Sequence, residues 1–260
     1  MREIETVSIG SVEDYLQELV PQLGFQRTPI YRGQNTEKWK ILPTLFREEV
    51  AKTESRSWSE LEGSLLIRMK QRARGELNYE PMSELEWMSI AQHHGLPTRL
   101  STWTENALVA LYFATEPGRE DEDGVVWRIL PGDANLVIAQ DYEQVPEQPR
   151  IYFPQKTTPS MLNQKTCYLC HPLPAEDAAP ETFEEYFELG DERMHLARLV
   201  VTASEKAFIR RRLATMGIEA RTLFPGMAGL CEQIKEEIYS FTDSYAVSYT
   251  HLTLPTSPKV

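Results

Sequence analysis

The stretch from residue 107 to residue 114 constrains the fold more than any other part of the sequence. It reads Ala107-Leu108-Val109-Ala110-Leu111-Tyr112-Phe113-Ala114 and carries no charged side chain. A helix that is apolar nearly all round has to be buried. We therefore predict a helix from Glu105 to about Glu116 at the centre of the fold, with Thr104 as its N-cap. The run is far short of the roughly 20 residues that span a bilayer.

The segments around this helix predict a mixed α and β chain. Caps, apolar periodicity and glycine stops predict helices at about residues 11–24, 58–74, 83–95, 204–217 and 227–239. Strands are expected at about 29–34, 125–130 and 196–202, the first of them ending in a turn at Gly33. Residues 39–46 are expected to be extended, and residues 131–180 to be strands joined by long loops. We predict an α+β fold, a single compact domain over residues 1–246 whose buried helix packs against a small sheet.

Charge and cysteine usage narrow the class of protein. The 260 residues have a formal net charge of -12 and a pI of about 5.0, which argues against a broad nucleic-acid footprint. Three cysteines suit a reducing compartment better than a disulfide framework. The charged start of the chain does not resemble a signal peptide. We expect a cytoplasmic protein without membrane attachment or a nucleic-acid partner.

The end of the chain differs in character from the rest. From Val247 to Thr256 it resembles one translated frame of a transposon adapter used for sequencing libraries. We therefore expect residues 247–260 to be a non-native tail, with the natural C-terminus missing, and they take no part in the functional argument.

Four motifs follow one another along the chain. They are Tyr31-Arg32-Gly33-Gln34; Leu42-Pro43-Thr44-Leu45-Phe46-Arg47; Ala91-Gln92-His93-His94-Gly95-Leu96-Pro97-Thr98-Arg99-Leu100 with Trp103-Thr104 and the apolar run; and Thr222-Leu223-Phe224-Pro225-Gly226. Together they resemble the FRG family, which is named for a Phe/Tyr-Arg-Gly motif. The third motif is the longest and the most specific. The resemblance implies an FRG-type domain, and it implies no settled biochemical activity.

Two positions depart from the family pattern. The family usually carries Leu-Asp between Leu100 and Trp103, where this chain has Ser101-Thr102, so a role for that aspartate does not carry over. The later Gln-x-Gly-x-Phe segment of the family is matched only in part, by Gln164-Lys165-Thr166-Cys167-Tyr168.

The segment from Gln92 to Thr104 is the first candidate for chemistry. Helical spacing puts His94 beside buried residues and His93 toward solvent. The guanidinium of Arg99 and the free N–H groups of the helix after Thr104 would form an anion site next to His94. Such a site suits a phosphate-bearing ligand such as a dinucleotide.

Arg32, at the end of its strand, would supply a second clamp, and Gly33 would let the backbone approach a ligand closely. We take His94 and Arg32 as candidate catalytic residues. The candidate ligand-binding residues are Tyr31, Gly33, Gln34, Gln92, Arg99, Trp103 and Thr104. The alternative is architectural, with His94 and Arg99 satisfying buried carbonyls and capping helix ends.

The layout also has a loose similarity to ADP-ribosyltransferases, which place an Arg or His on a first strand, then a Ser/Thr-rich strand leading into a helix, then a late catalytic Glu. Arg32 would match the first feature and Ser101-Thr102-Trp103-Thr104 the second, while Glu219 and Glu232 are available for the third without a motif. NAD would then be the cofactor. The opposing hypothesis is a non-catalytic protein-interaction or regulatory module, in which the same residues hold a nucleotide or an acidic segment of a protein partner.

Two further motifs have structural explanations. Cys167-Tyr168-Leu169-Cys170-His171 matches the haem-attachment pattern, and zinc would need a further ligand from Cys231 or His195. We expect structural cysteines on a strand and no metal site. Arg210-Arg211-Arg212 is expected to be a solvated helix face.

Overall fold

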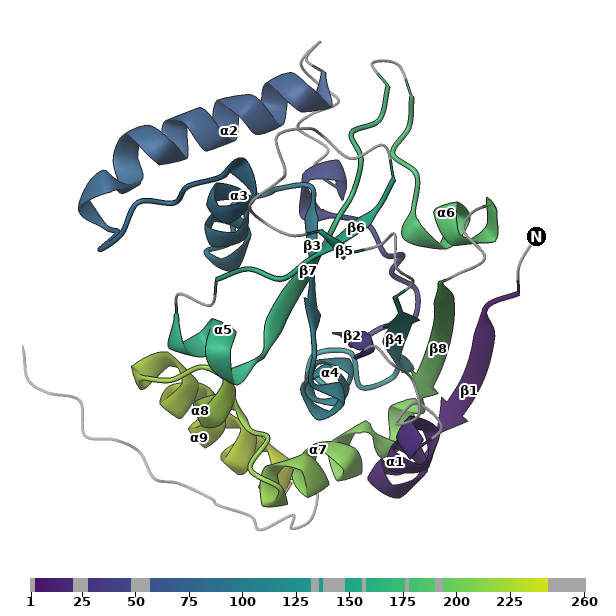
Figure 1. The fold of residues 1–260 in the computed structure, drawn as a ribbon. Helices are drawn as coiled ribbons and strands as arrows, with labels where there is room; N and C mark the ends of the chain where they lie inside the picture. Colours follow the sequence, from purple (N-terminus) through teal and green to yellow (C-terminus); the bar gives the residue numbers. More distant parts are fainter. Residues whose placement is uncertain are drawn as a thin grey trace, which may run out of the picture.

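The computed structural model describes residues 3–20, 28–47, 57–131, 136–137, 148–155, 158–175, 178–189 and 194–242. The expected non-native tail at 247–260 lies outside this part of the chain. The described strands form one eight-stranded sheet in the order β1-β8-β4-β2-β3-β7-β6-β5 (Figure 1). The strands are β1 Glu5–Ile9, β2 Ile30–Gln34, β3 Leu100–Thr104, β4 Gly124–Leu130, β5 Leu136–Val137, β6 Arg150–Tyr152, β7 Thr166–Cys170 and β8 His195–Val201.

Helices lie on both sides of this sheet. They are α1 Val12–Leu19, α2 Trp58–Arg72, α3 Glu84–His93, α4 Ala107–Ala114, α5 Pro159–Asn163, α6 Phe183–Leu189, α7 Lys206–Thr215, α8 Ala220–Leu223 and α9 Met227–Thr242, with short 3-10 turns η2 Thr44–Arg47, η4 Ala73–Gly75 and η7 Ala203–Glu205. In Figure 1, α1, α4, α7, α8 and α9 gather below the sheet, whereas α2 and α3 lie at the upper left. The mixed α+β fold is confirmed, and its sheet is larger than the small sheet expected.

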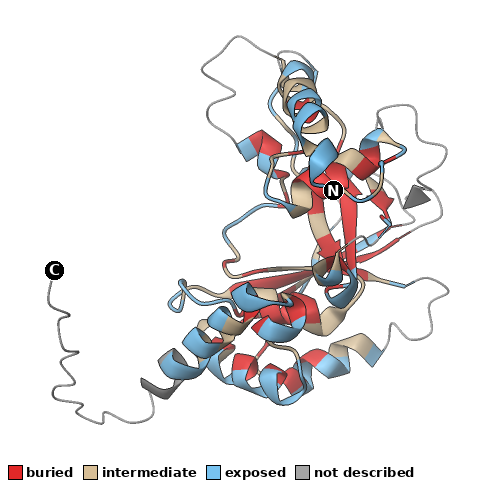
Figure 2. Cartoon of the chain, turned by 90° about the vertical axis from the view of Figure 1, so that its left-hand side faces the viewer, coloured by how far each residue is buried: buried red, intermediate tan, exposed pale blue. Residues whose placement is uncertain are grey.

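Three apolar cores hold these layers together. They lie on both faces of the sheet, because successive residues of a strand face opposite sides. The first core joins α1, α4, α7 and α8 to one half of the sheet and includes Tyr31. The second core lies on the opposite face, under α6, and includes Ile30 and Trp103. The third core joins α2, α3 and α5 to the other half and includes Leu100. The central strands β3, β4 and β7 are almost wholly buried (Figure 2).

Serine caps start three of the helices, and two of them, Ser11 and Ser83, stand at the first residue of a predicted helix. The hydroxyls of Ser11, Ser57 and Ser83 each accept a hydrogen bond from the backbone N–H three residues later. The helix predicted from Ser204 begins two residues later, at Lys206, because Ser204 lies in the preceding 3-10 turn and α7 has no side-chain cap.

The buried helix α4 packs so closely on the sheet that only glycine fits beneath it. A Cβ atom on Gly33 would lie 1.9 Å from the carbonyl oxygen of Ala110, and one on Gly124 would lie 2.1 Å from that of Ala114. The expected turn at Gly33 is therefore wrong: Gly33 lies inside β2, and its missing side chain admits α4.

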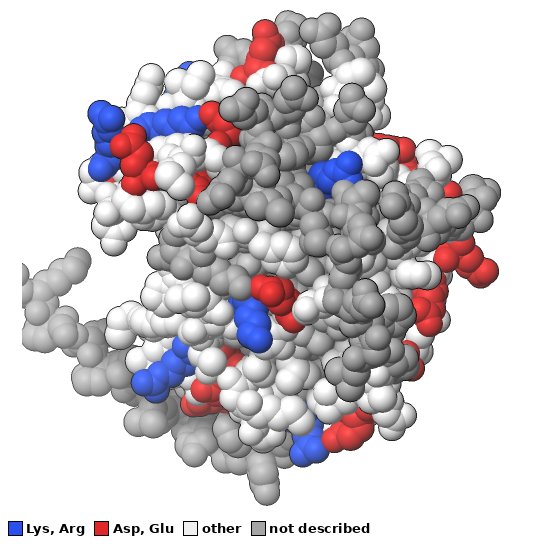
Figure 3. Space-filling model, viewed as in Figure 1, with Lys and Arg blue, Asp and Glu red and all other residues white. Residues whose placement is uncertain are grey.

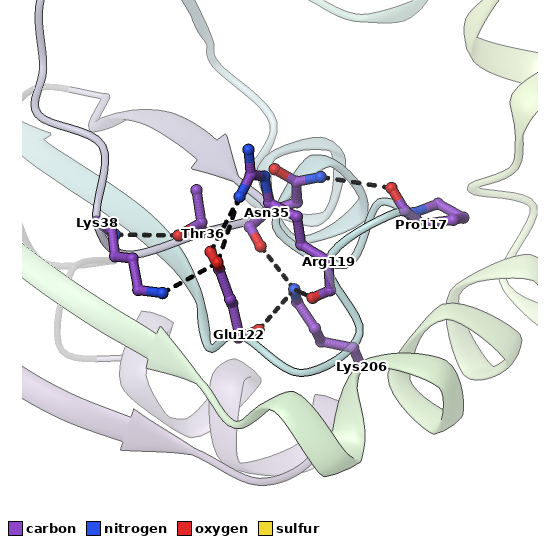
Figure 4. Close-up of polar contacts among 7 residues, drawn as sticks. All are labelled: Asn35, Thr36, Lys38, Pro117, Arg119, Glu122 and Lys206. Atoms are coloured by element: carbon purple, nitrogen blue, oxygen red, sulfur yellow. Dashed lines mark hydrogen bonds and ion pairs between the residues drawn. The ribbon is translucent and has the colours of Figure 1, made fainter.

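A buried lysine ties the end of β2 to α7. Lys206 is 5% exposed, and its Nζ donates to the carbonyl oxygens of Asn35 (2.6 Å), Arg119 (2.8 Å) and Glu122 (2.8 Å) (Figure 4). All three ammonium hydrogens thus have carbonyl acceptors, which fix the acidic turn before β4 against the end of β2.

Candidate functional site

β2 and β3 are neighbours in the sheet, yet they pair at a single position, Tyr31 with Thr104. On its other side β2 pairs with β4 along all five of its residues. The two central strands therefore diverge beyond Tyr31 and leave a gap in the middle of the sheet.

A cavity of about 210 Å³ lies at this gap. Its wall includes Tyr31 and Val109 of the first core and Trp103 of the second, so residues from both faces of the sheet line it. The residues that line it are Tyr31, Arg32, Gly33, Thr102, Trp103, Thr104, Val109, Phe113, Gln164 and Thr166. The sheet divergence and α4 together thus form a small, mainly apolar site with a few polar groups, which is the usual make-up of a ligand site.

Arg32 bridges the two diverging strands. Its Nη1 donates a 2.7 Å hydrogen bond to the carbonyl oxygen of Thr102, in place of a backbone pairing. Its Nε is buried and has no hydrogen-bond partner among the described residues. Burial lowers the pKa of Arg32 to about 10, and the charge of Arg47 adds to this effect. Arg32 is therefore still charged at neutral pH and keeps one buried donor for a further partner.

Two threonines face each other across β3 and β7 beside the cavity. The hydroxyl of Thr104 donates to the carbonyl oxygen of Gln164 (2.6 Å) and accepts from the backbone N–H of Asn106 (2.9 Å). The hydroxyl of Thr166, a residue that is 1% exposed, has no partner among the described residues. One hydroxyl of the pair therefore holds the structure together, and the other is available in the cavity.

A second guanidinium and a carboxylate act on Arg32. Arg47 lowers its pKa and Glu184 raises it, so both charges lie close to Arg32. Both carboxylate oxygens of Glu184 accept from the backbone N–H of Ile41 at 3.1 Å, and burial raises the pKa of Glu184. Among the described residues, Arg32, Arg47 and Glu184 therefore carry two positive charges and one negative charge, a net charge of one positive.

A buried hydrogen-bond chain supports β3 from the second core. The indole Nε1 of Trp103 donates to Ser101 Oγ (3.0 Å), which lies 3.1 Å from Nε2 of His171. His171 is 2% exposed, and burial, helped by the charge of Arg32, lowers its pKa to about 3. The imidazole is therefore neutral at pH 7 and lies close to the guanidinium of Arg32.

The comparison with protein families bears directly on this region. The family model described as the FRG domain matches residues 27–123. The chain contains an FRG domain. The match includes β2, β3 and α4 and all the residues that line the cavity except Gln164 and Thr166. No curated protein and no solved structure matches the chain.

The FRG domain brings part of the predicted site together. Of the candidate residues, Tyr31, Arg32, Gly33, Trp103 and Thr104 line the cavity. Gln34, Gln92, His94 and Arg99, which the structure also describes, lie elsewhere. The oxygen Oε1 of Gln34 accepts from the indole of Trp127 (2.9 Å), and Oε1 of Gln92 accepts from the hydroxyls of Thr44 and Thr98.

His94 and His93 have exchanged the environments expected for them. His94 is exposed, whereas His93 is half-buried and lies 2.9 Å from the hydroxyl of Thr158. The expectation assumed that the helix continues through His94. In the FRG domain α3 ends at His93, and His94 is its C-cap, so the helical spacing no longer applies to it.

Arg99 has a structural partner that the sequence did not reveal. Its guanidinium forms an ion pair with Glu62 of α2, and Nε of Arg99 donates to Glu62 Oε2 at 2.6 Å. Its backbone N–H also donates to Glu62 Oε1 at 3.0 Å. Arg99 is 6% exposed and Glu62 is 1% exposed. This buried pair anchors α2 to the start of β3.

The N-terminus of α4 already carries its own cap. Asn106, not Thr104, is the N-cap residue, and its side chain accepts from the N–H of Leu108 at 3.0 Å. The helix begins at Ala107, two residues later than expected. Thr104 remains a cavity residue, but the anion site expected at the start of this helix is partly taken up by Asn106.

The late glutamates Glu219 and Glu232 are not among the residues that line the cavity. Glu219 accepts from the side chain of Gln233 (3.1 Å), and Glu232 pairs with Lys235 (2.7 Å). Glu184 is instead the carboxylate that acts on Arg32, and sequence reasoning missed it along with Arg47, Gln164 and Thr166. For Gln164 and Thr166, the only sequence signal was the partial match of their segment to the family's Gln-x-Gly-x-Phe pattern.

The two strand cysteines face opposite sides of the sheet. Cys167 lies in the second core and Cys170 in the third, so they cannot bind one ion together. Within the described ranges, no group of three or more His, Cys, Asp or Glu residues could hold a metal.

Charged side chains on the described surface are interspersed. On the face shown in Figure 3, Lys and Arg form separate small groups among Asp and Glu. Arg210 is not part of a solvated basic face as expected: it is 9% exposed, pairs with Glu236 and lies over the ring of Tyr112 at 3.6 Å. Among the described helices, none has the length and apolar character that crossing a membrane requires.

Proposed function

We propose that this FRG domain binds a small nucleotide-type ligand, with a ring in the β2–β3 cavity and an anionic group against Arg32. The observation that carries the proposal is the buried, unpaired Nε of Arg32, since native proteins seldom leave such donors without a partner. The excess positive charge shared by Arg32, Arg47 and Glu184 supports an anion at the same place.

The size of the cavity supports a ligand that is only partly enclosed. Its volume of about 210 Å³ is below the roughly 300–1,000 Å³ of sites that enclose a drug-sized ligand. One ring with its substituent would therefore enter between Tyr31 and Phe113, and the phosphate-bearing remainder would extend along Arg32. NAD is the cofactor that suits best a site in which a ring is enclosed and a phosphate-bearing part remains outside the cavity.

We further propose that the ligand is used for ADP-ribosyl transfer. The order of features supports this: a strand with Arg32, a Ser/Thr-rich strand β3, and a helix directly after it. In the transfer, an acceptor atom bonds to C1′ of the ribose as the bond from C1′ to the nicotinamide nitrogen breaks. The proton of the acceptor needs a base, and Glu184 is the carboxylate whose charge acts on Arg32.

Thermal-shift measurements test the binding proposal. The full chain is titrated with NAD, ADP-ribose, AMP and inorganic phosphate, beside Arg32→Gln, Arg32→Lys and the control Arg212→Gln. Arg212 is a matched control because its ion pair with Glu13 is exposed. Ligand at about 100 Kd stabilises the folded state by about 2.7 kcal/mol. We expect that shift in the wild type and the control, a smaller one in Arg32→Lys and none in Arg32→Gln.

Two results would contradict the binding proposal: no shift with any ligand, or an equal shift in Arg32→Gln. The transfer proposal has its own readout, the release of nicotinamide from NAD, which Glu184→Gln should abolish without loss of NAD binding. A wild type that binds NAD without releasing nicotinamide, alone or with added protein acceptors, would favour the non-catalytic regulatory module.

A further inference from the structure

The last helix of the chain, α9, turns its polar side toward the rest of the domain. Nε2 of Gln233 donates to Glu219 at 3.1 Å, and Glu236 forms an ion pair with Arg210 of α7. Gly229, one turn before Gln233 on the same side, is buried, and a Cβ atom there would lie 1.9 Å from a backbone carbonyl oxygen at the end of α8. Hydrogen bonds, an ion pair and a close backbone contact therefore hold α9 against α7 and α8.

The apolar residues of α9 lie on the opposite side of the helix and face outward. Met227 is 71% exposed, Ile234 is 46% exposed and Ile238 is 59% exposed, and Cys231 is also exposed. Figure 2 shows α9 exposed along most of its length. A surface helix normally turns its apolar side toward the core, so the orientation of α9 is reversed. A continuous apolar stripe on the outside of a protein marks an interaction site.

The spacing of this stripe indicates what covers it. Met227, Cys231, Ile234 and Ile238 follow one another at intervals of four, three and four residues. This is the spacing of positions a and d in a coiled coil, where each apolar side chain packs between those of a facing helix. The stripe, here called the α9 seam, therefore fits a second helix.

The α9 seam is complementary to a second copy of itself when the two helices run antiparallel. With the two seams fully overlapped, Met227 of each copy packs on Ile238 of the other, and Cys231 packs on Ile234. Every apolar residue of the seam then meets an apolar residue, and the contact has twofold symmetry, as in most homodimers.

The charges beside the seam favour the same orientation. In the antiparallel pair Lys235 of one copy lies beside Glu232 of the other, and symmetry creates this ion pair twice. Within one copy the two residues pair at 2.7 Å, and their side chains are 57% and 48% exposed. In a parallel pair Lys235 would instead lie beside Leu230 of the second copy, with no such ion pair.

We propose that the FRG chain forms a symmetric homodimer through antiparallel α9 helices. The described seam, from Met227 to Ile238, is shorter than two heptads, so the interface is small and the dimer is weak and concentration-dependent. No residue of α9 lines the β2–β3 cavity, so the dimer is a feature separate from the proposed ligand site.

Sedimentation of the reduced full chain across the micromolar range tests the dimer. We expect the wild type to associate as its concentration rises, and Ile234→Glu or Ile238→Glu to raise the dissociation constant at least tenfold. Ile67→Glu in α2 is the matched control, because Ile67 is an isoleucine that is 57% exposed on another helix, and it should associate like the wild type. The substituted side chains are exposed, so the variants should keep the wild-type Tm. Monomers at every concentration, or undiminished association of Ile234→Glu, would overturn the proposal.

Charge exchange tests the ion pair beside the seam. Lys235→Glu should weaken the dimer, because two glutamates then face each other across the interface. Adding Glu232→Lys to the same chain should restore the dimer. Equal association of Lys235→Glu and the wild type would contradict the proposed alignment.

Disulfide formation tests the orientation of the two helices. The Cα atoms of a disulfide lie about 4.4–6.8 Å apart, and the antiparallel pair places Cys231 opposite residue 234 of the second copy. Cys167 and Cys170 are buried, so Cys231 is the cysteine that an oxidant reaches. Wild type mixed with a variant that combines Cys231→Ser and Ile234→Cys should form a disulfide-linked heterodimer, whereas each protein alone should form little. Wild type that crosslinks alone as readily as the mixture would show a parallel pair and overturn the antiparallel dimer.

Discussion

Nη1 of Arg32 lies 2.7 Å from the carbonyl oxygen of Thr102, across the gap where β2 and β3 cease to pair. The guanidinium thus satisfies an acceptor that a neighbouring strand would otherwise satisfy, and it holds the gap in a fixed shape. A charged side chain in this position bridges the split sheet, while its buried Nε has no hydrogen-bond partner among the described residues. Arg32 therefore has a structural role, and the proposed function gives it a second role in binding the ligand.

The ion pair of Arg99 with Glu62 predicts a structural role for a residue whose sequence context suggested ligand binding. Arg99→Leu leaves the buried carboxylate of Glu62 without its counter-charge, which should lower the free energy of unfolding by about 3–5 kcal/mol. Urea unfolding measures this loss. Lys70→Leu is the control, because the pair of Lys70 with Glu84 is largely exposed and should contribute no more than about 1 kcal/mol. Equal losses in the two variants would contradict the assignment.

Gly33 is expected to be intolerant of any side chain. In Gly33→Ala the new Cβ meets the carbonyl oxygen of Ala110 at 1.9 Å and the backbone nitrogen of Ala114 at 2.7 Å, so β2 or α4 has to move. The cost should be at least the 1–3 kcal/mol or so that overpacked cores show. Gly63→Ala in α2 meets nothing within 4 Å and should stabilise by up to about 1 kcal/mol. Thermal unfolding of the two variants should shift Tm in opposite directions, and a shift in the same direction would contradict the packing account.

His171 predicts a loss of stability in mild acid. Its folded pKa is about 3, far below the ordinary value of 6.5, so between these values the unfolded chain binds a proton that the folded chain does not. Stability should therefore fall as the pH drops below about 6.5, on the order of 1 kcal/mol per pH unit from this residue. Unfolding at pH 7.5 and 5.0 should show a smaller difference for His171→Gln than for the wild type. The exposed residue His195 supplies the control, His195→Gln, which should keep the wild-type difference. An unchanged difference in His171→Gln would show that His171 does not carry the effect.

Local signals in the sequence were sufficient for most of the helices and for the family. Ser11, Ser57 and Ser83 are caps whose hydrogen bonds reach only three residues along the chain, and the uncharged run of α4 can be satisfied only by burial. The same local signals failed at the end of α3, where the exact last residue of the helix decides which way a side chain points. Because α3 ends at His93, His94 turns outward and leaves the group of residues expected around it.

The cavity itself depends on contacts between distant parts of the chain. Thr166 meets the site because β7 pairs with β3 in one register, and Arg99 is withdrawn from it by Glu62, which lies 37 residues earlier. No periodicity in the sequence encodes the divergence of β2 from β3. Strand pairing of this kind is set by tertiary packing, so Tyr31, Arg32 and Thr104 could be named as candidates but not placed around a common cavity.

The most direct test of the binding site observes the Arg32 side chain itself. In a protein labelled with ¹⁵N at arginine, the Nε–H signal of Arg32 can be assigned by its absence from the spectrum of Arg32→Gln. Saturation with AMP or NAD should shift this signal and slow its exchange with solvent, because Nε gains the partner that it lacks. A signal that stays in place while the ligand is bound would place the ligand elsewhere and contradict the account.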